Sequence, residues 1–381
     1  MSDLVVLGGV ESGSSDGSPA LAHDRIDLMG MSLDELGDFA EQVLSERRFR
    51  GKQLFKWIYK RRVTDFDAMT DIAKATRAQL KEVAHISRME VRAAQRSRDG
   101  TIKFLWGLHD GLQVESVLIP EDTRLTLCIS TQVGCPLDCD FCVTGKGGYT
   151  RNLSKAEILG QVIQAQEHSP DRDLSNIVLM GMGEPLLNLD NVVDAMETAQ
   201  VSDGLDLSHR RITLSTVGLI PQMAELGKRS RINLAISLHG TTEEQRTALM
   251  PINRKYPLAD LVEALKAYPL RQKKLITIEY ILIRGVNDTV ADAKRLVRLL
   301  RKVPAKVNLI PYNKNPFTQY ERPDNPTIVA FQEVLMGAGL HTVTRLNRGG
   351  DIDAACGQLG GYKQQRPGKR RSASPKAEQG R

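Results

Sequence analysis

The sequence predicts an α/β protein, a partial (βα)6 barrel of the TIM type preceded by an accessory region of helices and a β-meander. From Leu125 onward, short apolar runs of strand length alternate with helix-like patterns, which is typical of βαβ units. These runs are continuously apolar, so we expect a parallel sheet that is buried on both faces. Two Asp-Gly pairs before Leu125 indicate β-hairpins. At roughly 150 residues per domain, the 381 residues are enough for two or three domains.

Composition excludes several classes of protein. The hydrophobic share of 41% and the charged share of 26% exclude collagen-like, wholly disordered and disulfide-scaffold chains. No apolar run approaches the roughly 18 residues that a membrane span needs. Residues 1–10 lack the basic region of a secretion signal, so we expect a cytoplasmic protein that does not contact a membrane. Five cysteines in such a chain point to metal or redox chemistry.

The sequence divides into five segments. We expect a disordered Gly/Ser-rich leader in residues 1–27, an accessory domain in 28–122, and the barrel in 123–347. A glycine-rich run predicts a mobile loop in residues 348–362, and residues 363–381 form a basic tail that we expect to be disordered. The tail has seven Lys or Arg and one acidic residue, so it accounts for the whole net charge of +6.

The first predicted elements are three helices between residues 32 and 84. Ser32 and Glu35 form a capping box for the first, and the others cover residues 51–61 and 71–83. Lys52, Lys56 and Lys60 recur every four residues and should share one helix face. Such a face can be merely solvated, but two adjacent basic helices in a chain that is otherwise charge-neutral favour a nucleic-acid surface.

The next predicted elements form a three-stranded meander. Its strands cover residues 89–96, 101–108 and 113–120, separated by Asp99-Gly100 and Asp110-Gly111. In the last strand, Glu115 shares an otherwise apolar face with Val117 and Ile119. Glu115 either leans into water or is buried near a substrate, where it would suit proton transfer.

The barrel then has seven predicted strands and six predicted helices. The strands are expected in residues 125–130, 177–180, 211–215, 232–238, 275–283, 307–311 and 341–345. The helices are expected in residues 155–167, 191–200, 220–228, 258–268, 290–301 and 326–337. In barrels of this kind the chemistry lies in the loops after the carboxyl ends of the strands.

Three closely spaced cysteines follow the first barrel strand. Cys135, Cys139 and Cys142 have the spacing C-x3-C-x2-C, which suits one zinc ion or an iron–sulfur cluster. No fourth cysteine or histidine lies within the next twenty residues, so an open coordination position is favoured over a closed structural site. Of the two other cysteines, Cys128 in a strand could be a small buried hydrophobe, and Cys356 could be an inert loop thiol.

Five segments together resemble a known family. These are QVGCPLDC at 132–139, GMGEPLLN at 181–188, TLST at 213–216, AISLH at 235–239 and DIDAACGQL at 351–359. The cysteine loop resembles that of radical S-adenosylmethionine (SAM) enzymes. All five segments together are similar to the RlmN/Cfr family of ribosomal RNA adenine methyltransferases, and closer to its RlmN branch. The likeness extends from about residue 28 to residue 361.

The resemblance implies two cofactors and their ligands. Cys135, Cys139 and Cys142 would hold a 4Fe-4S cluster whose open iron binds the amino and carboxylate groups of SAM. Residues matching the family's SAM-binding positions are Gly183, Glu184, Ser215, Ser237, Leu238, His239 and Asn313. Without the family resemblance, the GMGE segment at 181–184 could be an ordinary turn between a strand and a helix, and His239 could be a histidine of the core.

The resemblance also implies a mechanism. Cys356 would take a methyl group from one SAM, and a radical derived from a second SAM would activate that methyl group for addition to carbon 2 of adenine. Glu115 matches the base that removes the carbon-2 proton. Cys128 would then attack Cys356 and release the product by forming a disulfide.

The implied partners are 23S rRNA at the peptidyl transferase centre, some tRNAs at adenosine 37, and an electron donor such as flavodoxin. We expect a monomer. Two alternatives stay open on the sequence: a Cfr-like enzyme that methylates adenine carbon 8, and a non-catalytic, zinc-stapled RNA-binding protein.

Overall fold

The computed structural model describes residues 25–271 and 274–360. Most of the expected leader and the whole expected basic tail lie outside these residues. Ile26–Asp27, which we assigned to the leader, form the short strand β1 and pair with β2 (Ala84–His85). In the described part, no helix is long and apolar enough to cross a membrane.

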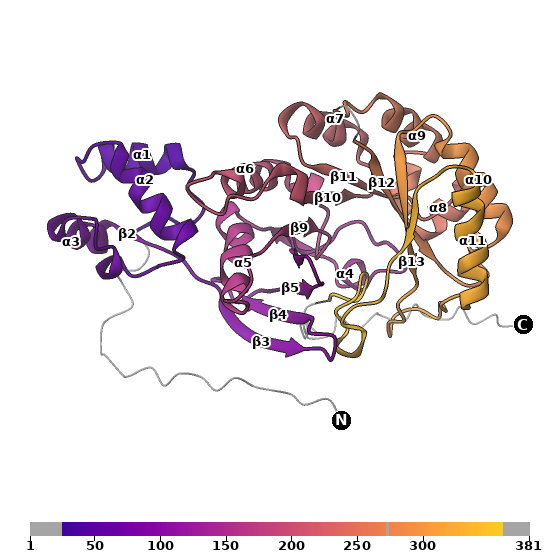
Figure 1. Ribbon diagram of the computed structural model, residues 1–381, viewed down its shortest axis with the longest axis horizontal. Helices are drawn as coiled ribbons and strands as arrows, with labels where there is room; N and C mark the ends of the chain where they lie inside the picture. The colour runs from indigo at the N-terminus through magenta and orange to yellow at the C-terminus, as the bar shows by residue number, and fades with distance from the viewer. Residues whose placement is uncertain (1–24, 272–273, 361–381) are drawn as a thin grey trace, which may run out of the picture.

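The dominant feature is one open, ten-stranded sheet (Figure 1). Its strand order is β14-β13-β12-β11-β10-β9-β6-β5-β4-β3, and every pair from β6 to β14 is parallel. The parallel strands are β6 (Leu125–Cys128), β9 (Asn176–Leu179), β10 (Ile212–Thr216), β11 (Asn233–Ser237), β12 (Ile276–Leu282), β13 (Ala305–Pro311) and β14 (Thr342–Thr344). This confirms the predicted partial barrel.

Helices between these strands cover the sheet, as the sequence predicts. They are α5 (Lys155–Glu167), α6 (Leu189–Gln200), α7 (Ile220–Arg229), α9 (Leu258–Ala267), α10 (Val290–Leu300) and α11 (Asn325–Gly337). Local sequence fixes several starts: Ser154 with Glu157 and Thr289 with Asp292 form capping boxes for α5 and α10. All seven residues of β12 are buried, as expected of a central parallel strand.

The meander is part of the same sheet. Its strands β3 (Glu90–Arg96), β4 (Ile102–Gly107) and β5 (Gln113–Pro120) are antiparallel, and β5 pairs antiparallel with β6. Hydrogen bonds therefore cross the proposed boundary between residues 122 and 123. The meander extends the barrel sheet at its β6 edge and brings Glu115 to the segment that follows β14.

The helical module is a separate layer beside α5 and α6 (Figure 1). It contains α1 (Leu33–Gln42), α2 (Phe49–Phe55), a π-helical turn (Lys56–Lys60), a 3₁₀ turn (Phe66–Ala68) and α3 (Lys74–Val83). The second predicted helix changes to π geometry at Lys56. The four-residue spacing of Lys52, Lys56 and Lys60 therefore no longer places all three side chains on one helix face. Lys52 and Lys56 instead form ion pairs with Asp203, at 2.8 and 3.1 Å.

One hairpin and two short helices near the barrel mouth were not predicted. The strands β7 (Gln132–Gly134) and β8 (Tyr149–Asn152) form the hairpin, which brackets the cysteine loop. The helices are α4 (Val143–Lys146), which begins directly after Cys142, and α8 (Glu243–Leu249), which is followed by a 3₁₀ turn (Pro251–Arg254). The hairpin and α4 hold the cysteine loop from both sides, which places its three thiols over the end of the sheet.

Candidate active site

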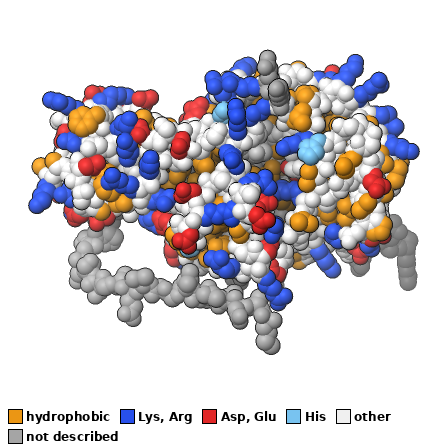
Figure 2. Space-filling view, in the orientation of Figure 1, with side chains coloured by type: hydrophobic (Ala, Val, Ile, Leu, Met, Phe, Trp, Pro, Cys, Tyr) orange, Lys and Arg blue, Asp and Glu red, His pale blue; other side chains and the backbone are white. Residues whose placement is uncertain are grey.

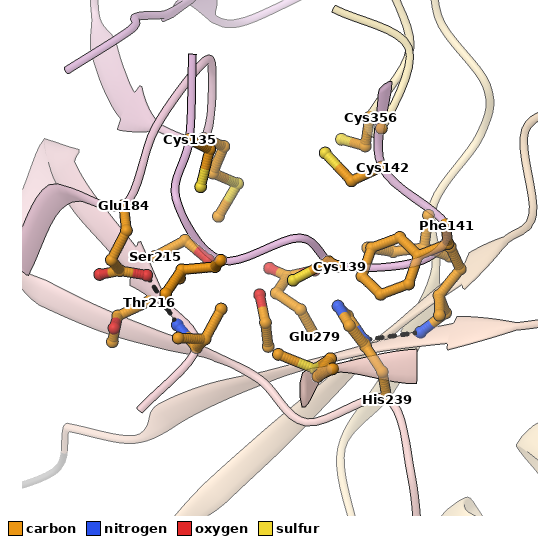
Figure 3. Close-up of a pocket in the computed structure, with 18 of the residues that line it drawn as sticks. Cys135, Cys139, Phe141, Cys142, Glu184, Ser215, Thr216, His239, Glu279 and Cys356 are labelled. Atoms are coloured by element: carbon orange, nitrogen blue, oxygen red, sulfur yellow. Dashed lines mark hydrogen bonds between the residues drawn. The ribbon is translucent and has the colours of Figure 1, made fainter. Parts of the chain in front are cut away.

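A cavity of about 150 Å³ lies at the carboxyl ends of the parallel strands (Figure 3). Segments far apart in the sequence meet there: the cysteine loop, the loop after β9, the ends of β10, β11 and β12, and the segment after β14. Its lining includes most of the predicted site residues, namely Cys135, Cys139, Cys142, Gly183, Glu184, Ser215, Ser237, His239 and Cys356.

The three loop cysteines face this cavity but do not converge on one point. Cys139 is buried, and Cys135 and Cys142 are partly exposed. Burial raises the pKa of Cys135 to about 12 and that of Cys139 well above the usual value, so these thiols need a bound cation to become thiolates. Within the described residues, no three His, Cys, Asp or Glu side chains are close enough to hold a single metal ion.

That spread bears on the choice between zinc and a cluster. A tetrahedral zinc site, with Zn–S bonds of 2.3 Å, requires sulfur atoms about 3.8 Å apart. In an iron–sulfur cluster each cysteine binds a different iron, so the sulfurs are farther apart. The donor set, three thiols that line one cavity, fits an iron–sulfur cluster.

Gly183 and Glu184 form a tightly built turn after β9. Gly183 has φ +103°, and a Cβ there would lie 2.6 Å from the Cβ of Gln132. The Gln132 side-chain oxygen accepts a hydrogen bond from the Glu184 backbone N–H at 2.8 Å. The Glu184 carboxylate accepts from the backbone N–H groups of Leu186 and Val217, each at 3.0 Å. Burial raises the pKa of Glu184 to about 7, although these hydrogen bonds oppose the shift.

His239 is buried and has the left-handed φ of 58°. Its Nδ1 accepts a hydrogen bond from the Ile281 backbone N–H at 3.1 Å, and its ring meets Phe141 edge-on with centroids 4.9 Å apart. Burial, with the charge of Arg246, lowers the pKa of His239 to about 3, so the ring is neutral at pH 7. The neutral ring is one of the side chains that line the cavity, and its assignment to SAM stays a prediction.

Two of the predicted SAM-binding residues do not line the cavity. Leu238 is fully buried, and its backbone N–H donates to the Glu279 carbonyl. Asn313 donates from Nδ2 to the Cys356 carbonyl at 3.2 Å, so it holds the segment that carries Cys356. Their assignment to SAM stays a prediction.

Cys356 lies between two cavities. It lines the main cavity and also a smaller one of about 20 Å³, which Cys128 lines as well. In Figure 3, Cys356 lies beside Cys142, across the cavity from Glu184. Cys128 is buried, and burial raises its pKa to about 12. The structure thus brings together two thiols that are 228 positions apart in the sequence.

Glu115 is buried, as one of the two readings of the sequence expected. One carboxylate oxygen accepts from the Gly360 backbone N–H at 2.9 Å, and the other is 3.7 Å from the Lys103 ammonium. Glu115 therefore ties the meander to the chain just after Cys356. It is not among the residues that line either cavity, so its role as a base stays a prediction.

Two charged residues at the site were missed by the sequence reasoning. Glu279, within β12, and Arg345, directly after β14, both line the main cavity. The sequence contains two signals that point to them: a carboxylate inside a continuously apolar strand, and a cation at the carboxyl end of the last strand.

Comparisons with known proteins agree with this site. Residues 26–86 match the family described as "Ribosomal RNA large subunit methyltransferase N-terminal domain", and residues 129–300 match the radical SAM superfamily. A curated relative from Syntrophotalea carbinolica, named dual-specificity RNA methyltransferase RlmN, is 51% identical over 94% of this chain and 96% of its own length. The chain belongs to the RlmN family.

Further similarities agree with the RlmN assignment. A protein of the same name from Geobacter sulfurreducens is 52% identical over 88% of this chain and 92% of its own. Among solved structures, a radical SAM methyltransferase from Sphaerobacter thermophilus has a TM-score of 0.84 and 38% identity, covering 88% of this chain and 100% of that one. The family resemblance and the radical SAM fold are both confirmed.

Proposed function

We propose that this RlmN-family chain methylates carbon 2 of a specific adenosine in 23S rRNA, at the peptidyl transferase centre, and of adenosine 37 in some tRNAs. Its relatives' name, dual-specificity RNA methyltransferase, supports two kinds of RNA substrate, and the matching N-terminal family is named for the large-subunit ribosomal RNA. The observation that carries the proposal is the position of Cys356, which faces the cluster cysteines on one side and Cys128 on the other.

The target carbon explains why a radical enzyme is needed. Carbon 2 of adenine lies between two ring nitrogens and is not nucleophilic, so polar methyl transfer cannot reach it. When bound, a 4Fe-4S cluster held by Cys135, Cys139 and Cys142 would supply, together with SAM, the one-electron chemistry that this carbon requires. The glycine turn and the carboxylate of Glu184 would orient the methionine end of SAM, and Ser215, Ser237 and His239 would line the rest of its site.

The chain's own thiols then act in sequence. Cys356 receives the methyl group as a thioether and presents it to the RNA base from the main cavity. Once that carbon has lost one hydrogen atom and is bonded to adenine in place of the carbon-2 proton, Cys128 attacks the Cys356 sulfur and gives up its thiol proton. A sulfur–sulfur bond forms and the sulfur–carbon bond breaks. The electron pair of the broken bond stays with the carbon, which takes up a proton and becomes the new methyl group of adenine.

Glu115 is the proposed base for the carbon-2 proton. Its present bond to Gly360 means that the segment after Cys356 has to shift before Glu115 can reach the substrate. We expect an external electron donor such as flavodoxin, a monomeric enzyme, and a cytoplasmic location.

The test combines RNA analysis with metal analysis. We expect 2-methyladenosine in 23S rRNA to disappear from a deletion strain and return with the wild-type gene, as mapped by mass spectrometry. Loss of 8-methyladenosine instead would assign the Cfr-like reaction. Zinc in place of iron and sulfide, after anaerobic purification, would reject the radical mechanism and favour an RNA-binding protein.

A further inference from the structure

Arg345 is held at the point where the two cavities meet. It lines both cavities together with Cys356 and Met180. Its Nη1 lies 3.8 Å from the Cys356 sulfur and 3.7 Å from the Met180 sulfur. Its backbone N–H donates to the Leu309 carbonyl at 2.8 Å, so the end of β14 fixes the origin of the side chain.

Glu279 provides the second observation. One carboxylate oxygen accepts from the Asn308 amide at 2.9 Å. The other is buried, has no hydrogen-bond partner in the described chain, and lies 4.0 Å from Arg345 Nη1. The Glu279 side chain is only 4% exposed, against 32% for Arg345. A buried carboxylate is costly unless a cation compensates it, so the attraction between Glu279 and Arg345 favours this position of the guanidinium.

We propose that Arg345, held by Glu279, is a positioning residue that orients the Cys356 sulfur and offsets its negative charge during methyl transfer. This inference rests on the proposed function, because it requires that Cys356 accept a methyl group. It adds to that function a residue pair with a specific role in the first of the two methyl transfers.

The chemistry of that transfer explains the need for a cation. The Cys356 sulfur attacks as a thiolate, its thiol proton having gone to water, and forms a bond to the methyl carbon. The bond from that carbon to the sulfonium sulfur of SAM breaks, its electron pair stays on that sulfur, and S-adenosylhomocysteine leaves. The Arg345 guanidinium, 3.8 Å from that sulfur, can offset the negative charge that the attacking sulfur carries.

The other polar groups near Cys356 and Arg345 do not supply a positive charge. Cys128 faces it from β6 and Cys142 from the cysteine loop, and both are thiols. Glu279 and Glu121 act on Arg345 from β12 and from the β5–β6 turn, and both are acidic. Arg345 is the cation that the described residues place against the Cys356 sulfur.

The experiment follows the first methyl transfer alone. Cluster-loaded enzyme is mixed anaerobically with deuterated-methyl SAM and no RNA, and methylation of the Cys356 peptide is timed by mass spectrometry. We expect Arg345→Gln to slow the rate at saturating SAM at least tenfold. Arg345→Lys should recover most of that loss because it restores the charge, and Glu279→Gln should slow the rate by a smaller factor. Arg322→Gln, at an exposed arginine, is the matched control.

Separate readouts keep the interpretation unambiguous. Cluster absorbance and the affinity for S-adenosylhomocysteine should stay within about twofold of wild type in the Arg345 variants. A wild-type rate of Cys356 methylation in Arg345→Gln would overturn the proposal. If that variant also bound RNA more weakly, Arg345 would instead be an RNA-binding residue. Loss of S-adenosylhomocysteine binding, or a Lys variant no faster than the Gln variant, would also overturn it. If wild-type enzyme never acquires a methyl group on Cys356, the proposed function itself fails.

Discussion

Replacing Gly183 by alanine should damage the SAM site in a way that the structure makes quantitative. The new Cβ would lie 2.6 and 2.7 Å from the Cβ and Cγ of Gln132, about 1 Å closer than a normal carbon contact of roughly 3.5–4.0 Å. Overpacking of this kind costs about 1–3 kcal/mol. The positive φ of 103° adds about 1–2 kcal/mol for any residue with a Cβ. The total is about 2–5 kcal/mol.

This loss should be local, because Gln132 also holds the Glu184 backbone through the 2.8 Å hydrogen bond. Amide hydrogen exchange over residues 182–187 would measure the free energy of local opening, and calorimetry the affinity for S-adenosylhomocysteine. We expect at least tenfold weaker binding, since about 1.4 kcal/mol corresponds to a factor of ten.

Gly111 offers a matched control. It has φ +80° in the β4–β5 turn, but no atom lies within 4 Å of the Cβ position. Gly111→Ala should therefore show only the backbone cost of about 1–2 kcal/mol and leave ligand affinity unchanged. If Gly183→Ala were no more harmful than Gly111→Ala, the crowding argument and the role of the turn in binding SAM would both be wrong.

Three further predictions concern the cluster, the buried carboxylate and the RNA surface. Cys139→Ala should lose the cluster's iron and visible absorbance together with SAM cleavage; a protein that keeps both would refute the ligand assignment. Because burial raises the pKa of Glu184 from 4.5 to about 7, the folded state holds a proton that the unfolded state releases. This contribution is complete below pH 4.5 and is lost as the pH rises through 7, so wild type should lose about 2–3 kcal/mol of unfolding free energy relative to Glu184→Gln between pH 5 and 8. An equal pH dependence in denaturant titrations of both proteins would contradict this. Lys60→Gln should flatten the log–log salt dependence of RNA binding by about 0.9, whereas Lys52, already paired with Asp203, should contribute less; an unchanged slope would leave Lys60 as solvated surface.

Much of the fold could be predicted because its signals are local. Continuous apolar strands, Asp-Gly turns and the Ser32–Glu35 capping box each depend on residues a few positions apart. The predictions fail where contacts between segments far apart in the sequence determine the structure. The hairpin around the cysteine loop has only three and four residues per strand, too short for a periodic pattern.

The site shows the same division. The three loop cysteines and the GMGE turn carry their signal in sequence spacing, but Glu279 and Arg345 are informative only once the fold sets them 4.0 Å apart. Likewise, nothing local in the sequence shows that β5 continues the barrel sheet, or that Glu115 holds the chain after Cys356.

The order of action of Cys356 and Cys128 is the central claim, and one variant tests it most directly. Cys128→Ala removes the thiol that would attack Cys356 but leaves the methyl acceptor and the cluster cysteines in place. A covalent link between enzyme and RNA should then persist, because no other free thiol lines the small cavity in the described structure. On a denaturing gel, Cys128→Ala purified from cells should run as a retarded, RNase-sensitive band, whereas Cys128→Ala with Cys356→Ala should not. Unmodified Cys128→Ala protein with normally methylated RNA would show that Cys128 is only a buried structural thiol.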